Sequence, residues 1–434
     1  MGTGRRPLTA RELQLADGMD DWRALGWGAV AWFEAPSLRP GAALVRAVAD
    51  AAGARLPDLD LRPGGVRVQV RRPPEGYGPE DLEQARAVSA TAARLGLRAD
   101  PAGVQDVQLA MDALDHAAVV PFWQAALGYV GLGEEDLVDP GRRLPSVWFQ
   151  EQDEPRPLRN RLHLDVVVPQ PVATATLAQV RARGARAVTE HGYYATVADA
   201  EGNEVDLLPL AEGADRWEGP ETADWRLVFS AMASYVAPGP GPAVELAGAV
   251  AGLADDSGLP LGVDLRASAD GEVVVTVDTG KDRWEMDEGY RPLAAQVQQA
   301  ARDLGLRADV DRARFLQVGI DAVDIPAVRR FWAAALGYVE DPRPHVTDLV
   351  DPRGLGIPFF LQPMEADDTA RRAQRNRVHV DVFVPDDRAQ ARIAAALRAG
   401  GRVVRDADAP FGTTIADPEG NEVDIAVEVG REEG

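Results

Sequence analysis

The stretch NRLHLDVVVP at residues 160–169 returns as NRVHVDVFVP at residues 376–385. Each copy is a short run of aliphatic and β-branched residues, which is typical of a buried strand. Each also places one of the five histidines of the chain in the middle of that strand. Because an imidazole can hold a metal ion or carry a proton, His163 and His379 are the first candidates for a functional site.

Other stretches return at nearly the same spacing. FWQAALGYV at 122–130 returns as FWAAALGYV at 331–339, and EGNEVD occurs at 201–206 and at 419–424. The offset drifts from 209 to 218 residues, as loop-length changes between two copies would make it do. The chain is therefore a tandem duplication, with its joint near residues 210–225.

The composition excludes several classes of protein. A net charge of −23 over 434 residues disfavours a nucleic-acid or anionic-membrane partner. The absence of cysteine excludes disulfides, thiolate nucleophiles and cysteine-held metals. Residues 1–22 have no apolar leader and no run of 18 apolar residues occurs, so we expect a cytoplasmic protein.

Each half divides into two parts, which predicts an α+β fold. The first part reads as a strand, a helix, two strands and a helix, and the second as two βαβββ units. We expect four domains, at residues 1–100, 101–212, 213–310 and 311–434.

The second parts resemble a known superfamily. Paired βαβββ units, FW.AALGY on a helix, NR.H.D on a strand and D.EGNE before the last strand are similar to the vicinal oxygen chelate superfamily, in its glyoxalase-like branch. The likeness covers about residues 104–210 and 314–428. It implies a cupped sheet that holds a divalent metal and a small organic molecule.

The stretch ARLPDLDLRPGGVRVQVRRPPEGYGPEDLEQARAVS at residues 54–89, in the first part of the first half, resembles the pterin-4a-carbinolamine dehydratase fold. Arg55 and Leu56 stand where that family has two histidines, and Arg72 stands at a later one. No histidine lies in residues 1–100 or 213–310, and dehydration needs an acid–base group near neutral pH. We therefore expect degenerate domains that pack or dimerise without that activity.

The superfamily takes metal ligands from the first and last strands of each βαβββ unit. Carried over position by position, this gives Gln108, Gln150, His163 and Asp206 in the first half, and Gln317, Gln362, His379 and Asp424 in the second. One imidazole, one carboxylate and amide oxygens suit Mn²⁺, Fe²⁺, Co²⁺, Ni²⁺ or Zn²⁺.

Strand alternation adds further polar residues to the same face, because residues two apart point the same way. Glu204 and Glu422 are candidate catalytic bases by this rule. Asp165 and Asp381, with the neighbouring Arg161 and Arg377, are candidate substrate-binding residues. The alternative for the arginines is solvation of loops, and for the histidines a structural role beside Asn160 and Arg161.

Three functions stay open at this point. The first is a metal-dependent lyase, isomerase or dioxygenase acting on a small organic molecule. The second is a metal-free protein that binds a drug or natural product and confers resistance, and the third is a structural module. The resemblance also implies that sites can form between paired domains, so we expect the two halves to pack together inside one chain and to supply walls of each other's pockets, with a homodimer as an alternative.

Overall fold

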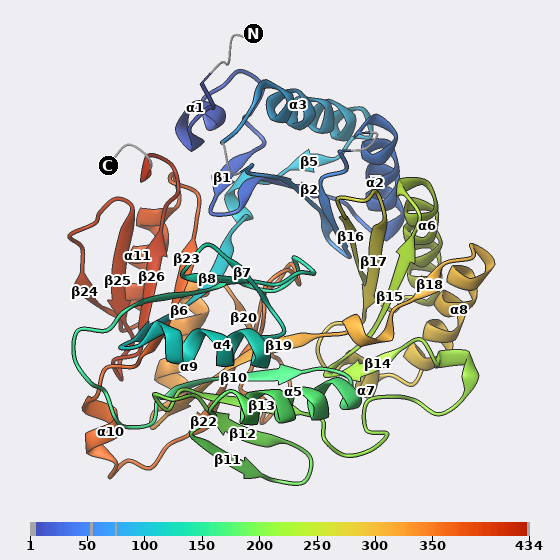
Figure 1. Cartoon of the computed structure of the whole chain (residues 1–434). Helices are drawn as coiled ribbons and strands as arrows, with labels where there is room; N and C mark the ends of the chain where they lie inside the picture. The colour runs from blue at the N-terminus through green and yellow to red at the C-terminus, as the bar shows by residue number, and fades with distance from the viewer. Residues whose placement is uncertain (1–5, 53–54, 74–75, 432–434) are drawn as a thin grey trace.

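The computed structural model describes residues 6–52, 55–73 and 76–431. They form one sheet of ten strands and two sheets of eight, with helices on the outer faces (Figure 1). This mixture agrees with the expected α+β class. Residues 1–5, part of the stretch without a leader pattern, lie outside the described residues. No helix in the described ranges is both long and apolar enough to cross a membrane.

The ten-stranded sheet joins the first parts of the two halves. The first half contributes β1 (Arg23–Leu25), β2 (Gly28–Glu34), β3 (Asp58–Arg62), β4 (Gly65–Arg71) and β5 (Arg98–Ala99). The second half contributes β14 (Arg226–Val228), β15 (Ser230–Ala237), β16 (Gly262–Ala267), β17 (Val273–Asp278) and β18 (Arg307–Ala308). The halves meet where β3 runs antiparallel to β16, with Asp60 opposite Asp264.

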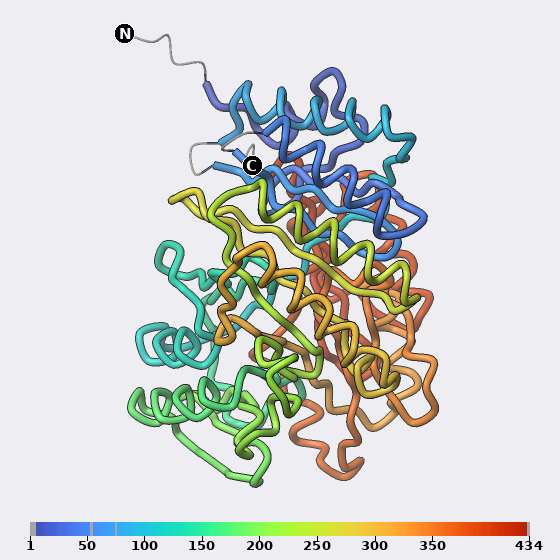
Figure 2. The backbone as a smooth tube through the Cα atoms, turned by 90° about the vertical axis from the view of Figure 1, so that its right-hand side faces the viewer, coloured from blue at the N-terminus to red at the C-terminus, as the bar shows by residue number. Residues whose placement is uncertain are grey.

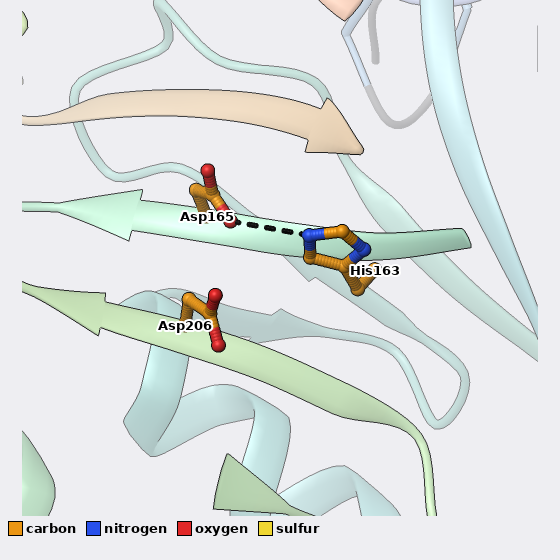
Figure 3. Close-up of side chains that lie close together, drawn as sticks. All are labelled: His163, Asp165 and Asp206. Atoms are coloured by element: carbon orange, nitrogen blue, oxygen red, sulfur yellow. Dashed lines mark ion pairs between the residues drawn. The ribbon is translucent and has the colours of Figure 1, made fainter. Parts of the chain in front are cut away.

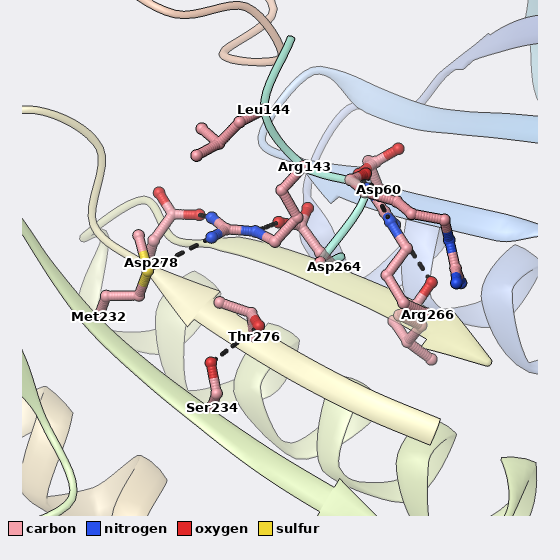
Figure 4. A network of polar contacts seen from close by, with 12 residues as sticks. Asp60, Arg143, Leu144, Met232, Ser234, Asp264, Arg266, Thr276 and Asp278 are labelled. Atoms are coloured by element: carbon pink, nitrogen blue, oxygen red, sulfur yellow. Dashed lines mark hydrogen bonds and ion pairs between the residues drawn. The ribbon is translucent and has the colours of Figure 1, made fainter. Parts of the chain in front are cut away.

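Buried ion pairs connect β3 and β16, with an arginine of each strand paired to an aspartate of the other (Figure 4). Arg62 lies 2.7 Å from Asp264, and Arg266 pairs with Asp60 in return. Arg143, from the second part of the first half, also donates to Asp264. Because a buried carboxylate without a partner is costly, these pairs fix which strands meet.

Helices cover one face of the ten-stranded sheet. They are α2 (Leu38–Ala52), α3 (Pro79–Arg94), α6 (Pro240–Ser257) and α8 (Tyr290–Asp303), with the short α1 (Ala10–Gln14) and α7 (Arg283–Met286) nearby. Helices α2 and α6 lie side by side, blue and yellow-green in Figure 2. A methyl group at Gly41 would collide with Leu61, so glycine lets α2 lie close on the sheet.

Each eight-stranded sheet takes four strands from each half. The β6–β23 sheet contains β6 (Asp106–Ala113), β7 (Val130–Leu132), β8 (Asp136–Val138), β9 (Val147–Glu151), β23 (Val378–Phe383), β24 (Arg402–Arg405), β25 (Gly412–Ala416) and β26 (Glu422–Ala426). The β10–β19 sheet contains β10 (Leu162–Val167), β11 (Ala187–Glu190), β12 (Ala195–Ala198), β13 (Glu204–Leu208), β19 (Phe315–Ala322), β20 (Val339–Glu340), β21 (Leu349–Val350) and β22 (Phe359–Pro363). Helices α4 (His116–Leu127), α5 (Gln170–Ala182), α9 (Ile325–Leu336), α10 (Thr369–Ala373) and α11 (Ala389–Arg398) and the turns η1 (Pro101–Gly103), η2 (Pro220–Thr222) and η3 (Val310–Arg312) complete the chain.

The pairing of βαβββ units differs from the sequence expectation. The two units of one half were expected to form one cupped sheet, but β10 of the first half pairs antiparallel with β19 of the second. Strand β23 of the second half pairs in the same way with β6 of the first. Alternation decides which face of a strand is buried but not which strand lies beside it, so sequence pattern alone could not find this exchange.

A reciprocal set of buried contacts, here called the Asn–Arg clamp, holds the exchanged units together. Its members are Asn160, Arg161, Asn203, Asn376, Arg377 and Asn421. Arg161 donates to Asn421 Oδ1, and Arg377 donates to Asn203 Oδ1, both at 2.8 Å. The repeated NR and GNE motifs therefore connect one half to the other.

Candidate metal centres

Three adjacent strands bring the polar residues of the β10–β19 sheet together. On β10, Leu162, Leu164 and Val166 belong to the hydrophobic core, so His163 and Asp165 point to the opposite face. Asp206 on β13 and Gln317 on β19 both stand directly opposite Asp165. We call His163, Asp165, Asp206 and Gln317 the first centre.

The first centre has the spacing of a metal site (Figure 3). Its imidazole and two carboxylates offer ligand atoms that all lie within 4.8 Å of one another. The His163 Nε2 to Asp165 Oδ1 distance is 3.6 Å, and Gln317 Nε2 donates to Asp165 Oδ2 at 2.7 Å. Asp165 Oδ1 and Gln317 Oε1 are buried and have no hydrogen-bond partner among the described residues.

The same trio recurs on the β6–β23 sheet. His379, Asp381 and Asp424 also offer ligand atoms within 4.8 Å of one another, and we call them the second centre. Trp148 Nε1 donates to Asp381 Oδ2 at 2.7 Å, in place of the glutamine of the first centre. Within the described ranges, Asp381 Oδ1 and Asp424 Oδ1 are buried without a hydrogen-bond partner.

Burial changes the acidity of both central carboxyl groups. Removal from water raises the pKa of Asp165 to about 6, against the opposing effect of His163. Burial likewise raises the pKa of Asp381 to about 6, against the effect of His379. Each of these groups can therefore exchange a proton near neutral pH.

The expected glutamines divide into two kinds. Gln108 stands opposite Asp381, and Gln317 stands opposite Asp165. Each glutamine therefore lies on the strand beside the histidine strand of the other half. The four expected ligands of one half are thus not neighbours, which corrects the grouping by halves. Gln150 donates instead to Asp112, and Gln362 donates to Asp321 at 2.6 Å.

The remaining candidates lie around the centres. Glu204 accepts from Arg159 at 2.6 Å, and Glu422 pairs with Arg375 at 2.8 Å. Arg161 and Arg377 were expected to bind substrate, but both guanidinium groups are buried in the Asn–Arg clamp and donate to backbone carbonyls of the other half. Contacts within the protein therefore occupy both guanidinium groups, which argues against the expected substrate-binding role.

The donor set fits a divalent transition ion. Imidazole nitrogen, carboxylate oxygen and an amide oxygen are ligands that Mn²⁺, Fe²⁺, Co²⁺, Ni²⁺ and Zn²⁺ accept. Buried oxygens without a partner cost free energy unless something occupies them, and both centres have such oxygens. The inclusion of Asp165 and Asp381 among the ligand atoms could have been found from their place two residues after each histidine.

Two segments of the chain are similar to a known family of domains. The glyoxalase-like domain family matches residues 108–208 and 317–426. The chain carries two glyoxalase-like segments. These findings support the vicinal oxygen chelate superfamily for this part of the chain, and the match does not extend to the ten-stranded sheet.

Similarity to individual proteins is low. A solved glyoxalase-related enzyme from Fulvimarina pelagi is 17% identical, with a TM-score of 0.19, and the match covers 26% of this chain and 85% of that one. None of the curated proteins compared with this chain matches it.

Proposed function

We propose that the chain is a metal-dependent enzyme of the vicinal oxygen chelate type, a lyase, isomerase or dioxygenase that acts on a small organic molecule. The observation that carries the proposal is the pair of buried His–Asp–Asp trios with unpartnered oxygens. Two exchanged sheets bring together the same three residue types.

The residues of the chain would divide the chemistry between them. His163, Asp165, Asp206 and Gln317 would hold the ion at the first centre, and His379, Asp381 and Asp424 at the second. A divalent transition ion supplies Lewis acidity, which polarises an oxygen of the substrate. Glu204 and Glu422 lie two residues before the last aspartate on the same faces, and we assign them the role of proton acceptor.

The dehydratase-like first parts serve in this proposal as a scaffold. Their strands form one continuous sheet across both halves. Residues 1–100 and 213–310 contain no histidine for acid–base chemistry. We therefore propose no dehydratase activity for them.

Metal content tests the proposal. Protein purified without chelator should hold about two equivalents of a transition metal by mass spectrometry, one for each trio. His163→Ala and His379→Ala should each remove about one equivalent, and the double variant should remove both, because the imidazole is the only nitrogen donor in each trio.

A matched control is His191→Ala, because His191 is exposed, stacks on Tyr194 and belongs to neither trio. It should leave the metal content unchanged. No metal in the wild type, and none taken up from Mn²⁺, Fe²⁺, Ni²⁺ or Zn²⁺, would favour the metal-free binding protein instead.

A further inference from the structure

Lys281 is the only lysine in the sequence, which has 46 lysine and arginine residues in all. It follows β17, and its side chain is only 12% exposed. The ammonium pairs with Asp348 and lies 5.9 Å from the ring centres of both Phe229 and Phe360. The lysine ammonium is a compact positive charge with three rotatable donors.

Lys281 lines a cavity of about 570 Å³ that reaches β19 at Phe315 and Leu316, the two residues before Gln317 of the first centre. Ser230 and Met232 of the ten-stranded sheet and Phe315 of β19 line it as well. This volume is in the range of pockets that hold small organic molecules, roughly 300–1,000 Å³. Seven basic and six acidic residues line the cavity, although acids outnumber bases by 69 to 46 in the whole chain.

The acidic residues of the wall largely have arginine partners. Asp60 and Asp264 belong to the joint between β3 and β16 (Figure 4), and Asp341 lies 2.8 Å from Arg343. Asp348 is the only hydrogen-bond partner of the Lys281 ammonium among the described residues. An ammonium has three donors, and aromatic faces are weak acceptors, so donors remain for a ligand.

Phe360 connects this lysine to the first centre. Its ring centre lies 5.6 Å from that of His163, and the Lys281 ammonium approaches it to 5.9 Å. Phe315 precedes Gln317 by two residues on β19, so both point to the same face. A molecule with its charged end at Lys281 would therefore extend along this face toward the first centre.

The second centre has a different neighbourhood. Trp148 takes the place of Phe360, opposite Ala110 as Phe360 is opposite Gly319. Arg72 follows β4 and lies 2.8 Å from Glu428. The cavity beside β4 and β6 measures about 210 Å³. The two centres thus share their trio but not their surroundings.

We propose that the cavity beside the first centre binds a small organic carboxylate, with Lys281 as the group that anchors the carboxylate. This rests on the proposed function in that it places the anion next to the first metal centre. It assigns the organic substrate to the first centre and gives that substrate a negative charge.

Amine labelling tests the proposal directly, because Lys281 and the N-terminal amine are the only primary amines. The full chain is reductively methylated in the presence of cinnamate, cinnamyl alcohol or cinnamyl phosphate. Peptide mass spectrometry then measures how much of each amine has been labelled. Cinnamate should slow labelling of Lys281 about tenfold, as a charged hydrogen bond in the cavity would. Labelling of the N-terminal amine should not change, and cinnamyl alcohol should not protect.

Calorimetric titration with cinnamate supplies the second measurement. Lys281→Met should weaken binding about tenfold, whereas Lys281→Arg should retain most of it because the charge stays. Lys281→Met leaves Asp348 without its partner, so Lys281→Met/Asp348→Asn is measured beside it to separate binding from folding. Equal protection by the alcohol, protection by the phosphate alone, or unchanged affinity in both lysine-to-methionine variants would overturn the proposal.

A failure of the proposed carboxylate site can be distinguished from a failure of the proposed metal sites. The titrations are repeated after treatment with chelator. Cinnamate protection that persists after chelation would support the anion site alone, and the metalloenzyme would be contradicted only if the protein also holds no metal as purified and takes none up from Mn²⁺, Fe²⁺, Ni²⁺ or Zn²⁺. Two bound metal ions without cinnamate protection would do the reverse.

Discussion

The two centres are copies of one site that now differ in the residues around the trio. In the first, Gln317 donates to the central aspartate, and Gly319 lies opposite the histidine. In the second, Trp148 donates to that aspartate, and Ala110 lies opposite the histidine. The two copies therefore share the same three side chains and differ in the residues that contact them.

The largest effect is expected at the Asn–Arg clamp, which the two copies share. Arg161→Ala and Arg377→Ala each remove a buried guanidinium that donates to an asparagine oxygen and to backbone carbonyls of the other half. Each asparagine oxygen then keeps only the amide donor of another asparagine. We expect each variant to lower the free energy of unfolding by about 3 kcal/mol. Urea unfolding followed by tryptophan fluorescence measures this.

A matched control shows whether the clamp stabilises the molecule more than a half-exposed ion pair does. Arg159→Ala is the matched control, because Arg159 is half-exposed and pairs with Glu204 at the edge of the sheet. It should cost less than about 1 kcal/mol. If Arg161→Ala lowers the free energy of unfolding no more than Arg159→Ala does, the clamp does not hold the two halves together.

A second comparison exchanges the residues that face the two histidines. A methyl group at Gly319 would overlap His163 Cε1 and Phe360 Cζ. Gly319→Ala should therefore displace the imidazole, remove metal from the first centre and cost about 2 kcal/mol of stability. Metal content and thermal unfolding measure the two effects.

The reverse exchange serves as its control. Ala110→Gly removes a methyl group opposite His379 and adds none, so the second centre should keep its metal. Its cost should be about 1 kcal/mol, from the freedom that glycine gains in the unfolded chain. Full metal occupancy of the first centre in Gly319→Ala would contradict the placement of His163.

The smallest effect is expected where the supports of the two aspartates differ. Trp148→Phe removes the indole donor to Asp381 and gives the second centre the aromatic residue of the first. We expect the metal affinity of the second centre to fall about tenfold and the free energy of unfolding to fall by about 1 kcal/mol. Titration with Co²⁺ in a His163→Ala background isolates this centre.

Phe360→Leu is the counterpart at the first centre. Phe360 donates no hydrogen bond, so this variant should leave the affinity of the first centre for Co²⁺ nearly unchanged while it removes the ring that the Lys281 ammonium faces. An affinity loss at the first centre as large as that from Trp148→Phe at the second would show that ring packing, and not the indole donor, supports the aspartates.

Much of the site could be predicted from the sequence. The repeat, the strand around His163 and the alternation that adds Asp165 to its face all follow from spacing. The same alternation could not place Arg161, which precedes the strand and is buried among carbonyls of the other half. Flanking cations are normally solvated, and nothing in their spacing indicates a clamp.

The pairing of strands from different halves could not be predicted from the alternation of apolar and polar residues, for a physical reason. Strands β10 (LHLDVV) and β23 (VHVDVF) have the same alternation of apolar and polar residues, so the pattern allows either to pair with β6 or β19. The choice depends on contacts distant in the chain, such as the pairing of Asp60 with Arg266 across the ten-stranded sheet. Lys281 was missed similarly, because a single lysine in a loop has no pattern of its own.

The most direct test of the central claim is a crystal of the wild-type protein grown with Mn²⁺ and measured for anomalous scattering. We expect two peaks, one between His163, Asp165 and Asp206 and one between His379, Asp381 and Asp424. Ordered protein with no peak at either trio, or with peaks only at surface carboxylates, would contradict it.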